Sequence, residues 1–121
     1  MINNDVKDII VDKIISYVKE YSNWREDDHD NLYADDVDAE LEFNLNGIDY
    51  FINVNMGMYV YLTHYSGDYL TPSEVSEKYT INIYNITIGV YNEETDEDTV
   101  EDLFVEDINK IEKEVNKYIN R

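Results

Sequence analysis

Two runs of alternating apolar and polar residues flank the dipeptide Asn46-Gly47, and this arrangement constrains the fold more than any other part of the sequence. Asn-Gly readily takes positive φ at both central positions of a two-residue type I′ turn, whose twist matches that of the strands it joins. Such a turn sets the register, so that apolar side chains meet on one face. The expected pairs are Leu45 with Ile48, Phe43 with Tyr50, Leu41 with Ile52, Ala39 with Val54 and Val37 with Met56.

The second strand of this hairpin is expected to continue, since Met58, Val60 and Leu62 keep the apolar face, with Gly57 suited to a β-bulge. A third strand is expected from Tyr79 to Tyr91. Its apolar residues change parity near Tyr84-Asn85, which predicts a bulge there; a tight turn is the less favoured alternative because glycine is lacking.

Asn4 or Asp5 is suited to cap a first helix, in which apolar residues recur at three- and four-residue steps. These residues are Val6, Ile9, Ile10, Ile14, Tyr17, Val18 and Tyr21. A β-strand over the same segment is disfavoured because alternation with period two never appears. Trp24 is expected to close the C-terminal end of this helix against the core.

A last helix is expected after a cap at Asp98 or Thr99. Its predicted buried stripe is Phe104, Ile108, Ile111, Val115, Tyr118 and Ile119. Residues 63–77 are expected to form a loop, in which Thr71-Pro72-Ser73-Glu74 resembles the cap of a single helical turn. The sequence therefore predicts one α+β domain over residues 1–121, with two layers: an N-terminal helix, an antiparallel three- to four-stranded β-meander and a C-terminal helix, both helices on one face.

The charge is extreme, with 28 acidic against 9 basic residues and a formal net charge of -19. Such a charge repels nucleic acid and anionic membranes, so no direct binding to either is expected. Cysteine is absent, which excludes disulfides, thiolate metal sites and a cysteine nucleophile. Neither a signal peptide nor an apolar run of membrane-spanning length is seen, which favours a cytoplasmic protein.

No motif for catalysis, metal binding or a cofactor is found. Asn92, Glu94, Asp96 and Asp98 alternate as calcium ligands would, but Leu103 stands where the twelfth position needs an acid, and the central glycine is missing. His29 and His64, the latter two residues before Ser66, lack the flanking motif of a nucleophilic site. We therefore expect a protein that is not an enzyme and that binds no metal or cofactor.

The odd-numbered face of the second strand carries aromatic and amide groups. Phe51, Tyr59, Tyr61 and Tyr65 would form a protein-binding surface if this face is exposed, because tyrosine gives large contact area at small entropic cost. If a helix covers this face, the same residues are ordinary core. The sequence leaves both alternatives open.

Two acidic blocks, residues 26–42 and 93–107, hold nine acids each. Their expected binding residues are Asp27, Asp28, Asp30, Asp35, Asp36, Asp38, Glu93, Glu94, Asp96, Glu97, Asp98, Glu101 and Asp102. As one block precedes the first expected strand and the other follows the last, the two begin at opposite ends of a three-stranded sheet. Carboxylates at such density can take the place of phosphates in a basic groove.

In size, charge and aromatic content the chain resembles small inhibitors made by phages and mobile elements, the anti-CRISPR and anti-restriction proteins that imitate DNA. The resemblance rests on the two acidic blocks and implies a basic partner, such as a nucleic-acid-binding host defence protein. Two further classes fit: an immunity protein or antagonist of a basic toxin, and a small phage structural or assembly protein. A homo-oligomer stays open.

Overall fold

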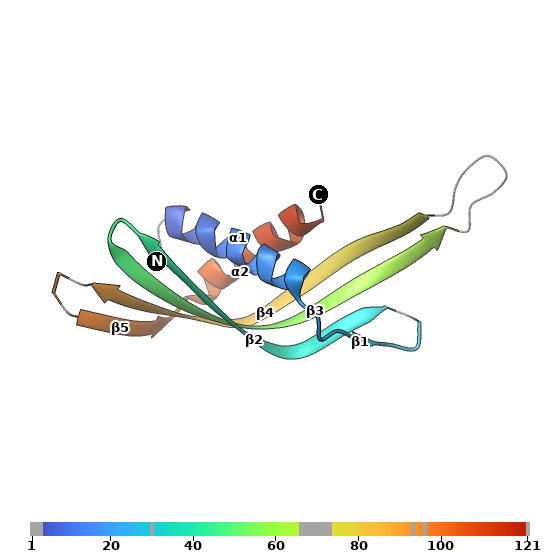
Figure 1. Ribbon diagram of the computed structural model, residues 1–121, viewed down its shortest axis with the longest axis horizontal. Helices are drawn as coiled ribbons and strands as arrows, with labels where there is room; N and C mark the ends of the chain where they lie inside the picture. The colour runs from blue at the N-terminus through green and yellow to red at the C-terminus, as the bar shows by residue number, and fades with distance from the viewer. Residues whose placement is uncertain (1–3, 30, 66–73, 93, 96, 121) are drawn as a thin grey trace.

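The computed structural model describes residues 4–29, 31–65, 74–92, 94–95 and 97–120. Its elements in chain order are α1 (Asn4–Glu20), β1 (Arg25–Glu26), β2 (Leu32–Leu45), β3 (Ile48–Tyr65), β4 (Glu74–Asn92), β5 (Glu97–Asp102) and α2 (Val105–Ile119). The strands form one antiparallel sheet in the order β1-β2-β3-β4-β5. The α+β meander between two helices is confirmed, with five strands in the described residues (Figure 1).

The β2–β3 hairpin has the expected register. All five predicted apolar pairs are present, from Leu45 opposite Ile48 to Val37 opposite Met56. Asn46 and Gly47 both have positive φ, 55° and 81°, as a type I′ turn requires. Turn chemistry and strand pattern therefore specify the same pairing.

Two β-bulges flank the middle of β3. In β4, Tyr84 is the extra residue, because Met56 pairs with Ile83 and Asn55 with Asn85. This confirms the predicted bulge, which returns the apolar residues of β4 to the helix-covered face. Gly57 was expected to bulge, and this is wrong, since it pairs with Asn82 in a regular ladder.

The second bulge lies in β2, between Ala34 and Val37. Asp36 takes a left-handed φ of 54° there. Asp adopts this conformation more readily than most residues other than glycine, so Asp36 is suited to the bulge.

The strands are longer than the sequence predicted. Thr63–Tyr65 and Glu74–Glu77 belong to β3 and β4, so the expected loop over residues 63–77 is wrong at both ends. The expected helical turn at Thr71 falls on residues 66–73, outside the described part of the chain, except that Glu74 begins β4.

The helix expected from Thr99 begins only at Val105, because residues 97–102 form β5 and pair with β4. Pairing supplies hydrogen bonds to the outer edge of β4, and the sequence pattern alone does not reveal this gain. Phe104 is the residue before α2 and provides no side-chain cap.

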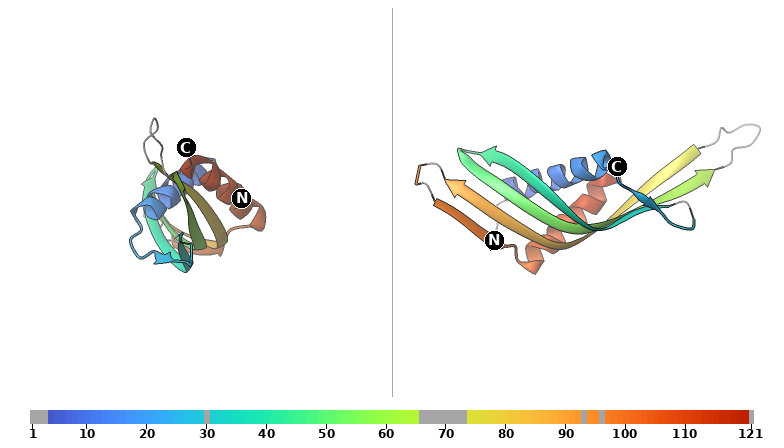
Figure 2. Two further views of the ribbon diagram at one scale, coloured as in Figure 1. Left: turned by 90° about the vertical axis from the view of Figure 1, so that its right-hand side faces the viewer. Right: turned by 60° about the horizontal axis from the view of Figure 1, so that its bottom comes forward.

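Both helices lie side by side over one face of the sheet (Figures 1 and 2), with α1 contacting β2 and α2 contacting β4. The core lies between the helices and this face. It includes Ile10 and Ile14 of α1, Ala39 and Val54 of the hairpin, and Ile111 of α2. Trp24 packs partly buried against the core and makes an edge-on ring contact with Tyr21, as expected.

In α2 the stripe Ile108, Ile111, Val115 and Ile119 is buried, as predicted. Phe104 and Tyr118 were expected to be buried, and this is wrong: Phe104 precedes the helix in an extended conformation, and both side chains are exposed. Within the described residues, neither α1 nor α2 combines the length and apolarity that a membrane-spanning helix needs.

Candidate protein-binding face

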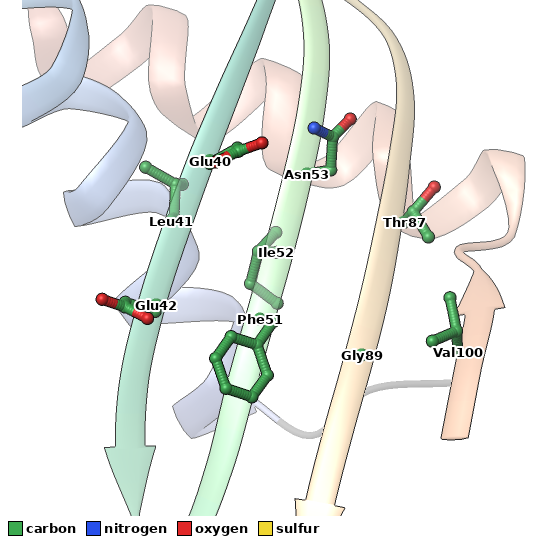
Figure 3. A pocket seen from close by; sticks show the side chains of 9 residues that line it. All are labelled: Glu40, Leu41, Glu42, Phe51, Ile52, Asn53, Thr87, Gly89 and Val100. Carbon is green, nitrogen blue, oxygen red and sulfur yellow. The ribbon is translucent and has the colours of Figure 1, made fainter. Parts of the chain in front are cut away.

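The face of the sheet opposite the helices is called the open face here. Residues directly opposite in an antiparallel ladder point their side chains to the same side, so the register gives the rows that cross this face. One row is Glu42, Phe51, Gly89 and Val100; the next is Glu40, Asn53, Thr87 and Asp102. Figure 3 shows the first row and, of the second, Glu40, Asn53 and Thr87. Neither helix covers them (Figures 1 and 2).

A row of exposed carboxylates follows β2 along the open face. Asp38, Glu40 and Glu42 alternate with buried residues, so successive carboxylates recur every ~6.7 Å along the strand. The side-chain nitrogen of Asn55 donates to Asp36 Oδ1 at 2.8 Å and to Asp38 Oδ1 at 3.0 Å. Among the described residues, no lysine or arginine forms an ion pair with any acid of β2. This strand therefore presents a line of uncompensated negative charge.

A hollow of about 430 Å³ lies on the open face beside this line. Phe51 and Val100 stand on either side of it and are 51% and 73% exposed. Gly89 lies between them in the register, and a Cβ built there would approach Phe51 Cβ at 3.6 Å and Val100 Cγ2 at 3.7 Å. The missing side chain of Gly89 therefore leaves the gap between the two apolar groups (Figure 3).

The second acidic block borders the other side of the same face. Asp102 of β5 is exposed and accepts a hydrogen bond from Thr87 Oγ1 at 3.1 Å. The row from Glu40 to Asp102 spans three strand spacings, or ~14 Å. Glu101 is also exposed, but it pairs with buried Ile88 and so belongs to the helix-covered side; Glu94, between β4 and β5, is exposed.

The expectation that one acidic block precedes the first strand and the other follows the last is wrong, although the blocks do begin at opposite ends of the sheet, the first at Glu26 beside the start of β2 and the second after the end of β4. Much of each block is itself strand, in β2 and β5, so the register brings Asp38, Glu40 and Glu42 of the first block to one border of the open face and Asp102 of the second to the other. Of the predicted acids, Asp35, Asp36 and Asp38 lie exposed in β2. Outside the described residues or side chains lie Asp30, Glu93, Asp96, Glu97 and Asp98.

Asp27 holds a turn together and is not a free surface acid. Its Oδ1 accepts hydrogen bonds from the backbone N–H groups of His29 and Asn31, at 2.8 and 2.9 Å, and its Oδ2 accepts one from the Tyr59 hydroxyl at 3.0 Å. Partial burial raises the pKa of the Asp27 carboxyl, but these hydrogen bonds outweigh it, so the pKa lies below its ordinary value. Asp28 is exposed in the same turn.

The aromatic residues on the odd-numbered side of β3 are not core. Phe51 and Tyr61 are exposed, whereas Tyr59 is half-buried and donates to Asp27. The side chain of Tyr65 lies outside the described set. Phe51 and Tyr59 are eight residues apart in one strand, or ~26 Å, so they do not form one patch. Phe51 alone of these residues lines the hollow.

Sequence reasoning missed four residues of the open face: Glu40, Glu42, Gly89 and Val100. Glu40 and Glu42 carried a usable signal, because the predicted hairpin register already put them on the polar face of β2. Val100 carried none, since its place beside Gly89 depends on β5 being a strand, and Gly89 comes opposite Phe51 only through the register of β3 with β4.

The open face can accept cationic groups through carboxylates at both borders and can bury apolar surface at its centre. No protein-family model matches this sequence, and neither a curated protein nor a solved structure matches it.

Proposed function

We propose that this chain is a non-enzymatic acidic binding protein whose open face occupies a basic protein surface that otherwise binds nucleic acid. The observation that carries the proposal is the row of exposed carboxylates on β2, which no helix covers. In this proposal the protein inhibits its partner by occlusion, as do the small phage and mobile-element inhibitors that it resembles.

Charge and geometry both support this function. A net charge of -19 is far beyond what solubility requires in a small domain. The β2 backbone fixes the spacing of the carboxylates before binding, so contact with a basic groove has to order only their side-chain rotamers. Their field also speeds the encounter with a positive surface.

The experiment compares two double charge reversals of equal net charge. Glu40→Lys with Glu42→Lys changes the open face, and Asp12→Lys with Glu20→Lys changes exposed positions of α1. Each reversal adds two charges, so both variants carry -15 instead of -19. Immobilised wild-type and variant proteins are offered bacterial proteins that were first eluted from heparin, and the retained partner is then measured by binding kinetics.

The open-face variant should lose at least tenfold in affinity, mainly through a slower on-rate, while the α1 variant should lose little. Duplex DNA or RNA should compete for the same site on the partner, and binding should weaken steeply with salt. Equal losses of affinity in the two variants would mean that binding depends on the net charge of the protein and not on the open face. Binding that ignores nucleic acid would favour an antagonist of a basic toxin.

A further inference from the structure

The centre of the open face has a side-chain arrangement that diffuse charge recognition does not need. Phe51 and Val100 are exposed apolar groups, and Gly89, which lies buried between them, adds no side chain to the hollow. A valine or threonine at position 89 would suit a β-strand and would close this gap. The hollow is therefore set by one residue, Gly89.

Carboxylates stand at one side of this hollow. Glu42 is directly opposite Phe51, and Glu40 is in the adjacent row; both are exposed and both line the hollow. Figure 3 shows the Phe51 ring between Glu42 on one side and Gly89 on the other. A group that enters over Gly89 thus meets apolar surface first, then an aromatic ring, and then negative charge.

We propose that this hollow binds an arginine side chain of the basic partner. Its methylene groups lie over Gly89 between Phe51 and Val100, and its guanidinium stacks on the Phe51 ring and donates to Glu42 and Glu40. The inference rests on the proposed function, because it names the side chain through which a basic partner is held.

Arginine fits better than lysine for two reasons. The guanidinium is planar and weakly hydrated, so it stacks on an aromatic ring and still presents N–H groups at its edge to a carboxylate. A lysine ammonium is a compact, strongly hydrated charge that gains less from the ring. Carboxylates without the aromatic group would discriminate far less between the two.

Two other occupants are disfavoured by charge. A second copy of this chain brings another -19 toward the acidic strand, and nucleic acid brings phosphates. An apolar ligand without a cation leaves Glu40 and Glu42 unpaired. The negative charge around the hollow therefore favours a cationic partner, and the Phe51 ring favours arginine over lysine.

The test uses two peptides of equal charge, hexa-arginine and hexa-lysine, with the full-length protein at physiological salt. Gly89→Val fills the hollow and keeps every charge. Thr80→Val is the matched control, since it lies in the same strand, is exposed, and pairs with Tyr59 far from the hollow. Fluorescence anisotropy gives affinities, and amide NMR shifts locate the site.

Wild type should bind hexa-arginine about fivefold or more tightly than hexa-lysine, with the largest shifts at Phe51, Gly89 and Val100. Gly89→Val should abolish this preference and leave weak, salt-sensitive binding of both peptides, and Thr80→Val should keep the preference. Equal affinities in wild type, or an unchanged preference in Gly89→Val, would overturn the arginine site. The proposed function is tested separately by the Glu40→Lys with Glu42→Lys variant. If this variant binds the basic partner more weakly, the proposed function stands even when the arginine site is overturned. If it binds the partner as wild type does, the proposed function fails.

Discussion

Asn116 of α2 and Ile81 of β4 exchange two hydrogen bonds. The side-chain nitrogen of Asn116 donates to the carbonyl of Ile81 at 2.9 Å, and the backbone N–H of Ile81 donates to Asn116 Oδ1 at 2.8 Å. Asn120 makes the same two-way exchange with Tyr79, and the Ile83 N–H donates to Glu112 at 2.8 Å. Side chains spaced four apart, on α2 and at its C-cap residue Asn120, thus replace a neighbouring strand along β4, where β5 does not reach.

We expect Asn116→Ala to lower the free energy of unfolding by ~2 kcal/mol, because it leaves the backbone groups of buried Ile81 without partners. Asn109→Ala, at an exposed position of α2, is the control and should change little. Urea denaturation measures both. Similar midpoints for the two variants would show that water replaces the Asn116 amide without cost.

Gly47→Ala should destabilise the protein by ~1–2 kcal/mol, since alanine is strained at a φ of 81°. Gly89→Ala is the control, because its Cβ meets neighbours no closer than 3.5 Å, at the Phe51 carbonyl oxygen. The expected order of urea midpoints is Gly47→Ala well below Gly89→Ala. The reverse order would show that the type I′ turn is not the element that fixes the register of the hairpin.

The melting temperature should rise as NaCl increases from low to physiological concentration. The acids of β2 repel one another, and among the described residues no basic side chain forms an ion pair with them; Lys7 pairs instead with Glu114 of α2, at 3.1 Å. Differential scanning calorimetry measures the change. The Glu40→Lys with Glu42→Lys variant should melt higher at low salt and gain less from added salt. If the melting temperature of wild type did not change with salt, the acids of β2 would have to be neutralised by other groups of the protein.

Tyr59→Phe should destabilise the protein near neutral pH and progressively less at both extremes. The folded-state pKa of Asp27 is lowered, so its stabilising contribution is present above about pH 4 and is lost as the pH falls through that lowered pKa. Desolvation, then the Asp27 hydrogen bond and charge, raise the pKa of Tyr59, so its contribution is present below about pH 10 and is lost as the pH rises through the raised pKa.

Urea unfolding of wild type and Tyr59→Phe from pH 3 to pH 11 provides this comparison. Tyr61→Phe, at an exposed position of the same strand, is the control and should change the free energy of unfolding little. If the difference in free energy of unfolding between wild type and Tyr59→Phe stayed constant with pH, the hydrogen bond between Tyr59 and Asp27 would not be what stabilises the turn.

The sequence predicted the parts of this fold that depend on local rules. The register of the hairpin followed from Asn46-Gly47, and the bulge at Tyr84 followed from the change of parity between Ile83 and Ile86. Both are signals within a single strand or turn, where period two and turn chemistry decide the outcome.

The parts that were missed depend on contacts between distant segments. Residues 97–102 have the acidic composition of a helix start, yet they become a strand because β4 offers an unpaired edge. No local pattern indicates that Asn116 and Asn120 bind backbone groups 35 and 41 residues earlier. The hollow at Gly89 is likewise a product of β5 and cannot be read from any one segment.

The outer edge of β2 adds a practical point about solubility. In the described part of the chain, β1 pairs with β2 only at Leu32 and Tyr33, so the rest of this long strand is an edge. Open edges tend to join edges of other molecules, and charged side chains along them discourage this. Replacing Glu40 and Glu42 by glutamine would therefore favour self-association, which would look like a loss of partner binding. Replacing them by lysine keeps charged side chains along the strand and so still disfavours self-association.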